Sequence, residues 1–319
     1  MRTVFIGGHP RSGTTLLGAM IGAHTQCICT PESQFKTRVL RRLSIAQKDP
    51  IDISKAVQAI QKDWRFKIWG IDLHSLPYHE IDSYPELIFR ILKLYREKFD
   101  KHNADIWIDH TPSNIKNANS LLALFPESKF IHIVRDGRGV AASIMPLDWG
   151  PNTIDNAARS WVKRISHYLK IESSTGEKGM LRIRFEDLVL KPAMILEGIC
   201  NFLNIDYQPQ MLQGQGFHVP QYTSRQHSLV GKAPDPSEVN AWERELKPRQ
   251  VEIFENIAGE LLVSLGYQLK FGLNTKKMSG SEKLISNIQE IVRREIINKS
   301  RHRHRIKQGV ALSSTKDTS

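Results

Sequence analysis

The sequence predicts an α/β fold in which a parallel sheet of the P-loop type carries helices on both faces. Short apolar segments alternate with helical patterns along the chain, and this alternation is typical of a parallel sheet. We expect strands at residues 3–7, 105–108, 129–134 and 181–184 and helices at 14–23, 114–124, 137–143 and 192–203. Because ligands of such folds bind at the carboxyl ends of the strands, the loops that follow the strands are the candidate site.

The loop after the first strand has the frame of a phosphate-binding loop. Gly8 and Gly13 bound a G-x-x-x-x-G pattern that continues directly into Thr14 and Thr15. Backbone N–H groups and a helix N-terminus hold a phosphate in such loops. A nucleotide kinase would have a lysine at position 14, whereas here the positive charge lies inside the loop at Arg11. The pattern therefore predicts a site for a phosphate-like anion other than a nucleoside triphosphate.

A second motif follows the third predicted strand. Residues 130–143 read FIHIVRDGRGVAAS, an apolar strand that ends near Arg135 and a helix that contains Ser143. The first loop, PRSGTT from Pro10, resembles the 5′-phosphosulfate loop of sulfotransferases that use 3′-phosphoadenosine 5′-phosphosulfate (PAPS). The second motif resembles the 3′-phosphate site of the same family. The resemblance implies a sulfotransferase fold and cofactor binding by Arg11, Ser12, Gly13, Thr14, Thr15, Arg135 and Ser143.

The pattern is most similar to that of the tyrosylprotein sulfotransferases and their bacterial relatives. In those proteins the loop is followed by Ala-His and a cysteine-rich turn that contains a glutamate, and this chain has AH at 23–24, Cys27, Cys29 and Glu32. The similarity continues through RFEDLVLKP at 184–192 and covers roughly residues 1–270. Two residues differ from the family pattern, which makes the substrate harder to infer than the reaction. Phe185 stands where the family has a tyrosine that contacts the nucleotide, and Ala241 stands where it has a lysine.

Three residues are candidates for the chemistry. Arg11 is the expected electrostatic partner of the departing phosphate, since sulfuryl transfer resembles in-line phosphoryl transfer. Glu32 follows Arg11 by the spacing of the family's catalytic glutamate and is our candidate base. A glutamate that caps a helix or forms an ion pair is the simpler alternative. His110 is the second candidate, as a proton acceptor or as a donor near the position of the family's lysine.

Several segments lie outside these motifs. Residues 36–64 and 84–102 are predicted helical insertions between the first two strands, where they would form part of the acceptor cleft. The long Gly- and Pro-containing segment 206–240 is a candidate lid over the nucleotide, with Ser224, Ser228 and Lys232 as candidate contacts. A last helix is expected from Pro248 to about Leu265.

Charge is concentrated at the C-terminal end. The chain has 319 residues and a net charge of +12, of which residues 272–319 supply +7 from eleven Lys or Arg and four Asp or Glu. We therefore divide the chain into a sulfotransferase domain, 1–271, and a basic amphipathic tail, 272–319, helical and then disordered. The tail is either solvated or an amphipathic helix that contacts an anionic membrane surface or a partner. Because basic and aromatic residues do not interleave, we do not expect a nucleic-acid partner.

Composition limits the remaining alternatives. With 40% hydrophobic and 24% charged residues, the chain is predicted to be globular. Since residue 1 leads almost directly into the first strand, we expect a cytoplasmic protein without a signal peptide or membrane span. Three cysteines form no disulfide framework, and no metal is expected. Alternatives to a sulfotransferase are a P-loop kinase and a non-catalytic nucleotide-binding protein. A peptide tyrosine, a sugar, a lipid head group and a small phenol all remain open as acceptors.

Overall fold

A five-stranded parallel sheet forms the centre of the molecule. The computed structural model describes residues 1–42, 52–219, 230–304 and 307. The strands are arranged in the order β2-β3-β1-β4-β5, and every neighbouring pair is parallel. They comprise β1 (Arg2–Gly8), β2 (Cys27–Thr30), β3 (Ile106–Asp109), β4 (Lys129–Val134) and β5 (Met180–Arg184).

Alternating side chains divide the core into two layers. Val4 and Ile6 of β1 pack into one hydrophobic cluster, while Phe5 between them packs into another. Trp107, between Ile106 and Ile108 of β3, follows the same rule. Because successive side chains of a strand point to opposite faces, an apolar run of this kind requires cover on both sides of the sheet.

Helices provide that cover on both faces. The first cluster takes its helical side chains from α1 (Thr14–Gly22), α9 (Phe185–Leu190) and α10 (Pro192–Leu203). The second takes them mainly from α2 (Phe35–Arg42), α3 (Ile53–Lys62), α4 (Trp64–Lys67), α5 (Tyr84–Lys98), α6 (Ala118–Leu124) and α8 (Ile154–Thr175). Short 3₁₀ turns join these elements at Tyr78–Glu80, Pro112–Asn117, Pro209–Gln213 and Pro236–Glu238.

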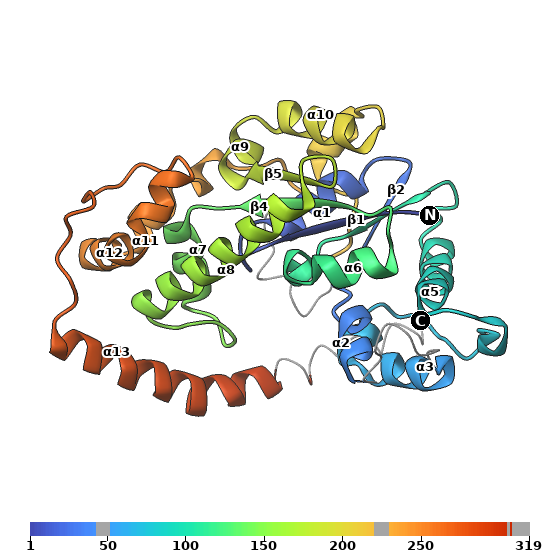
Figure 1. Ribbon diagram of the computed structural model, residues 1–319, viewed down its shortest axis with the longest axis horizontal. Coiled ribbons are helices and arrows are strands. Elements are labelled where there is room, and N and C mark those ends of the chain that lie inside the picture. Colours follow the sequence, from blue (N-terminus) through green and yellow to red (C-terminus); the bar gives the residue numbers. More distant parts are fainter. Residues whose placement is uncertain (43–51, 220–229, 305–306, 308–319) are drawn as a thin grey trace.

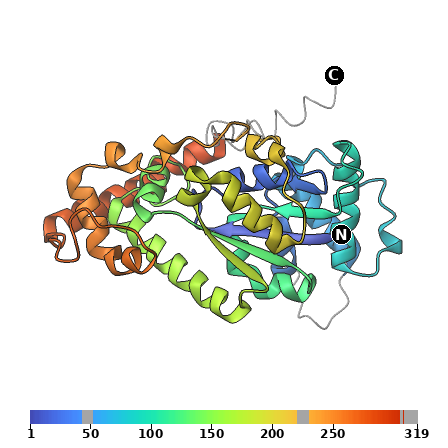
Figure 2. The ribbon, with the colours of Figure 1, turned by 90° about the horizontal axis from the view of Figure 1, so that it is seen from above.

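A third cluster extends the molecule beyond the end of β4. It joins α7 (Gly137–Ile144) and α8 to α11 (Trp242–Glu245) and α12 (Pro248–Ser264). The buried guanidinium of Arg138 on α7 forms ion pairs with Asp136, at 2.7 Å, and with Glu255 of α12, at 2.6 Å. Figures 1 and 2 show the consequence, with the sheet in the middle, α3 and α5 at one end and α11 and α12 at the other.

The predicted α/β class and its four strands are confirmed to within a residue or two. One prediction is wrong, because residues 27–30 form the edge strand β2 rather than a turn. The helical insertions therefore follow the second strand of the chain and not the first. Helix α8, with 22 residues, was not predicted.

The C-terminal segment is helical over its described part. Helix α13 (Gly280–Val292) continues through a π-helical segment, Arg293–Asn298. Ser279 caps α13 by accepting a hydrogen bond from the backbone N–H of Glu282 at 3.2 Å, and the Glu282 carboxylate accepts one from the backbone N–H of Ser279. Among the described residues, no helix is long and apolar enough to cross a bilayer.

Candidate functional site

A cavity of about 820 Å³ lies at the carboxyl ends of the strands. It combines residues from both sequence motifs with residues from the insertion and from the C-terminal helix. The lining includes Arg11, Gly13, Thr14, Thr15, Glu32, Arg41, Trp64, Arg65, Arg135, Ser143, Trp149, Arg164, Phe185, Trp242 and His302. Seven of the nine predicted site residues therefore share one cavity, and Ser12 and His110 are not among its lining.

The loop between β1 and α1 turns through two left-handed residues. Arg11 has φ 73° and Gly13 has φ 95°. A Cβ at Gly13 would lie 2.6 Å from the ring of Phe185, so both the conformation and the space at position 13 favour glycine. This turn brings the start of α1 to the cavity.

The N-terminus of α1 supplies hydrogen-bond donors to the cavity wall. Thr14, Thr15 and Leu16 form its first turn and line the cavity. Their backbone N–H groups precede the first intrahelical hydrogen bond, Leu17 N–H to the Gly13 carbonyl at 3.0 Å. No side chain caps this end. The donors and the helix dipole together favour an anion at this position.

The two motifs meet across the cavity. Arg11 Nε donates a 2.9 Å hydrogen bond to Ser143 Oγ on α7. Arg135, which follows β4, donates from Nη1 to the Arg11 carbonyl at 3.1 Å. The residues that the sequence assigned to two separate phosphate sites thus form one connected cluster.

The Arg135 side chain is contacted by an aromatic ring and by a backbone carbonyl. Its guanidinium lies 4.3 Å from the centre of the Phe185 ring, and its Nη2 donates to the Glu238 carbonyl at 3.4 Å. The Arg135 carbonyl accepts a 3.2 Å hydrogen bond from the Trp161 indole. Arg135 Nε is buried and has no hydrogen-bond partner within the described parts of the chain. A buried donor without a partner indicates that the site is shaped for a further acceptor.

The electrostatics of the cluster also favour an anionic ligand. Burial, together with the neighbouring charge of Arg135, lowers the pKa of Arg11 to about 10. Burial likewise lowers the pKa of Arg135. Two cations held close together in a partly dehydrated site repel each other, and a multiply charged anion would relieve that repulsion. An anion with two phosphate-like groups, as in PAPS, fits this donor set.

Glu32 lies in the same cavity, in the turn between β2 and α2. Burial raises the pKa of this carboxyl group, and Arg65 opposes that effect. Gln34 Nε2 donates a 2.9 Å hydrogen bond to Glu32 Oε2. A carboxylate whose pKa is raised toward neutrality accepts a proton more readily than an exposed one.

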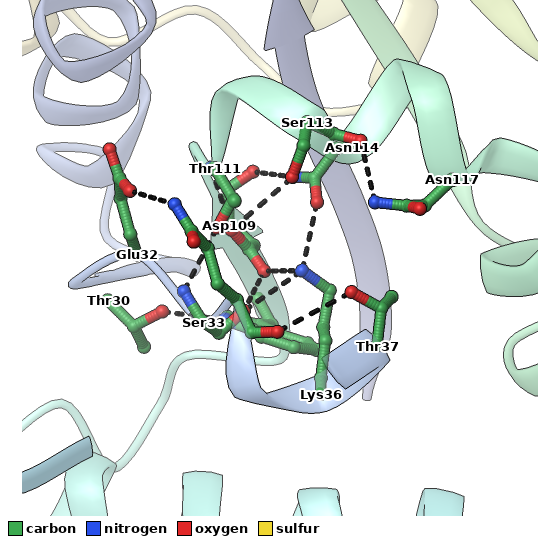
Figure 3. Close-up of polar contacts among 12 residues, drawn as sticks. Thr30, Glu32, Ser33, Lys36, Thr37, Asp109, Thr111, Ser113, Asn114 and Asn117 are labelled. Atoms are coloured by element: carbon green, nitrogen blue, oxygen red, sulfur yellow. Dashed lines mark hydrogen bonds and ion pairs between the residues drawn. The ribbon is translucent and has the colours of Figure 1, made fainter. Parts of the chain in front are cut away.

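A buried polar network fixes the turn that carries Glu32 (Figure 3). Lys36 Nζ lies 2.5 Å from Asp109 Oδ2, 3.0 Å from Ser33 Oγ and 2.9 Å from Asn114 Oδ1. Thr111 Oγ1 accepts from the backbone N–H of Ser33 at 2.9 Å and donates to Asp109 Oδ1 at 2.6 Å. The end of β3 is thereby tied to the residue next to Glu32.

The sequence did not predict this network. Lys36 is one of four basic residues in α2 (FKTRVLRR), and its partner Asp109 is 73 positions away. No local sequence pattern marks Lys36 as buried, and only the structure shows that its side chain is 1% exposed. Such burial of a lysine requires a paired carboxylate.

The structure places His110 away from the other candidates. Its ring packs edge-on against Phe217, with the centroids 4.9 Å apart, and a Cβ at Gly18 of α1 would lie 2.9 Å from His110 Cβ. Both ring nitrogens are buried without a hydrogen-bond partner in the described segments, and burial lowers the pKa of the ring to about 4. Glu32 therefore lines the cavity, whereas His110 does not. Ser12, which belongs to the loop itself, is fully buried.

Basic and aromatic side chains from distant elements complete the cavity beyond Glu32. Arg41 and Arg65 come from the helical insertion, and Arg164 comes from α8. His302 comes from the C-terminal helix and lies 3.9 Å from Asp148, beside Trp149. Of the candidate lid contacts, Ser224 and Ser228 fall outside the described residues, and Lys232 is exposed.

Comparisons with known proteins agree with the fold and with the family resemblance. A model described as the sulfotransferase family matches residues 3–209. Protein-tyrosine sulfotransferase A of Caenorhabditis elegans is 29% identical over 215 residues, 66% of this chain and 51% of the relative. Protein-tyrosine sulfotransferase 1 of Danio rerio is 27% identical over 271 residues, 82% of this chain and 67% of the relative. The chain spans about half the length of the first of these relatives.

Two solved structures share the fold. The sulfotransferase domain from the Curacin biosynthetic pathway superposes with a TM-score of 0.57 at 19% identity, covering 84% of this chain and 98% of that domain. The sulfotransferase domain from the Synechococcus PCC 7002 olefin synthase gives a TM-score of 0.59 at 19% identity, with coverages of 84% and 95%. Since the family match covers residues 3–209, well over half of the chain, the chain belongs to the sulfotransferase family.

Proposed function

We propose that the protein transfers a sulfuryl group from PAPS to a hydroxyl acceptor. The observation that carries the proposal is the shared cavity of Arg11, Arg135 and Glu32, which joins an anion site to a carboxylate of raised pKa. The protein-tyrosine sulfotransferases among its relatives support this reaction and make a tyrosine hydroxyl the first acceptor to test.

The binding residues have distinct expected roles. The N-terminus of α1 and the Arg11 side chain would hold the 5′-phosphosulfate, and Arg135 with Ser143 would hold the 3′-phosphate. PAPS, when bound, supplies the sulfuryl group and a good phosphate leaving group. Arg11 neutralises negative charge that grows on the leaving phosphate, so its contribution is expected to be larger in the transition state than in the ground state.

Glu32 provides the proton acceptor. Its side chain lines the same cavity as Arg11 and Arg135, together with Gln34 and Arg65. An ionised Glu32 would remove the proton of the acceptor hydroxyl as its oxygen attacks sulfur. Thr14 stands where a P-loop kinase has its lysine, so the site favours sulfuryl transfer over phosphoryl transfer.

The test is direct. The purified protein is incubated with radiolabelled PAPS and with a tyrosine-containing peptide, a sugar, a lipid and a simple phenol, and sulfated products are separated. Sulfate transfer to one acceptor, lost in Glu32→Gln and retained in the exposed control Arg244→Ala, is the expected result. Phosphate transfer from ATP without any sulfate transfer would support the kinase alternative instead.

A further inference from the structure

The C-terminal helix turns its apolar face toward solvent. Six aliphatic side chains of the helix are each between 41% and 67% exposed, namely Leu284, Ile285, Ile288, Ile291, Val292 and Ile296. Their spacing of three and four residues places them on one stripe of the helix. In Figure 1, α13 runs along the lower edge of the molecule. A soluble protein rarely exposes a contiguous aliphatic stripe unless that stripe binds something.

The opposite, polar face of the helix packs on the body. Ser286 is buried and donates a hydrogen bond to the carboxylate of Asp155 on α8. Glu290 Oε2 accepts hydrogen bonds from the backbone N–H of Asn152, at 2.9 Å, and from Thr153 Oγ1, at 3.1 Å. A surface helix normally buries its apolar face and exposes its polar face. Here the arrangement is the reverse.

The π-helical segment preserves this orientation to the end of the stripe. Asn298 is buried, and its Nδ2 donates a 2.7 Å hydrogen bond to Asn152 Oδ1. In an uninterrupted α-helix, Asn298 would lie seven residues after Ile291 and therefore on the same face as Ile291. The wider π turn rotates Asn298 toward the body while Ile296 stays exposed, at 67%.

The charges of the segment complement an anionic surface. Glu282 forms an ion pair with Arg249 at 2.9 Å, and Glu290 accepts a hydrogen bond from the body. Both acidic side chains of α13 therefore point away from the exposed stripe. Arg301 and Arg303 are exposed just beyond the C-terminal end of the stripe. Glu295 is also exposed near that end, but it forms ion pairs with Arg294, at 2.8 Å, and with Lys299, at 2.5 Å. The outward surface of this helix is thus aliphatic, with exposed basic side chains at its C-terminal end.

We propose that this helix face docks the protein on an anionic lipid bilayer. An amphipathic helix of this kind lies in the plane of the membrane with its aliphatic face among the acyl chains and its lysine and arginine side chains near the head groups. The polar contacts with α8 hold the helix in place beforehand, so docking requires no unfolding of the body. This proposal does not depend on the reaction that the cavity carries out.

The experiment measures co-sedimentation of the full chain with vesicles of phosphatidylcholine alone or with about one-third phosphatidylglycerol. Wild type is expected to bind the anionic vesicles and to be released by salt. Ile288 lies on the stripe and is 55% exposed in the free protein. Ile288→Asp is expected to lower partitioning about tenfold or more, since it places a charge where the bilayer would bury an aliphatic side chain. Leu190→Asp on α9, with a matched 53% exposure, is expected to bind like wild type.

A second variant tests the charge separately. Arg301→Gln removes one exposed positive charge beyond the C-terminal end of the stripe. A loss of about fivefold on anionic vesicles is expected, with no change in the thermal melt. Equal binding to neutral and anionic vesicles, or no binding to either, would overturn the proposal. So would a wild-type dimer in light scattering that Ile288→Asp converts to monomer, because the stripe would then be covered by a second copy.

Discussion

Lys36 and Asp109 form an ion pair, 2.5 Å between Nζ and Oδ2, with both side chains removed from solvent. The pair holds the pKa of Asp109 below its usual range despite burial, through the charge and the hydrogen bond of Lys36. It also joins the first turn of α2 to the end of β3, and so it fixes the turn that carries Glu32.

Replacing Lys36 by Met should therefore destabilise the fold strongly. The change leaves Asp109 buried with its charge uncompensated, and breaking a buried pair in this way costs about 3–5 kcal/mol in free energy of unfolding. The exposed pair Arg2–Asp105 provides the control, and Arg2→Met should cost at most about 1 kcal/mol. Denaturant unfolding of both variants measures the difference, and equal losses would contradict the expectation.

Nucleotide selectivity should depend on the cluster around Arg135. The protein should bind 3′-phosphoadenosine 5′-phosphate about tenfold to a hundredfold more tightly than AMP, because one charge-assisted contact contributes about 1.5–3 kcal/mol. Ser143→Ala should reduce this ratio and leave AMP affinity nearly unchanged. Titration calorimetry with both nucleotides measures the ratio, and Arg244→Ala serves as the control. Equal affinities in wild type would remove the 3′-phosphate site from our assignment.

Arg11→Ala should reduce kcat more than it reduces cofactor affinity. The charge that Arg11 meets grows in the transition state, and loss of one such group typically lowers the rate by about 10²–10³-fold. Steady-state kinetics compared with direct binding separates the two effects. Normal turnover with weakened binding would make Arg11 a binding residue only.

Glu32→Gln should abolish turnover and leave nucleotide affinity unchanged, with a rate loss of about 10²–10⁴-fold. Since burial raises the pKa of Glu32, wild-type activity should fall on the acid side at a higher pH than an ordinary glutamate would allow. A raised carboxyl pKa favours the folded state at low pH, and that contribution is lost as pH rises through it. At neutral pH the glutamine variant should therefore be at least as stable as wild type. An inactive His110→Ala enzyme with an active Glu32→Gln enzyme would reverse the two roles.

Gly13→Ala should weaken cofactor binding and stability together. The left-handed conformation and the contact with Phe185 both exclude a Cβ at position 13. Gly198→Ala on α10 is a matched control, because a Cβ there meets nothing within 4 Å, and the change should stabilise the helix by about 0.5–1 kcal/mol. Thermal melts and nucleotide titrations of the two variants test the contrast.

The local pattern of the sequence determined the strands and the glycine-bounded loop after β1. Apolar runs such as residues 129–134 are buried on both faces, and this pattern predicts a central parallel strand without knowledge of its neighbours. Gly13 and the helix that follows define the loop within a few residues of chain. Strand β2 was missed because its four residues, Cys27–Thr30, are too few to show a period and lie between turn-like neighbours.

Tertiary structure alone decided which residues meet. Residues more than 70 positions apart are in contact in two places, Arg11 with Ser143 and Lys36 with Asp109. His302 likewise lines the cavity although it is far from the other lining residues in the sequence. The sequence showed the amphipathic stripe of 284–296 but not that its polar side would face the body. Hydrophobic periodicity states which side chains share a face. Only the packing of the whole chain selects the face that solvent sees, because that choice depends on partners such as Asp155 and Asn152 elsewhere in the sequence.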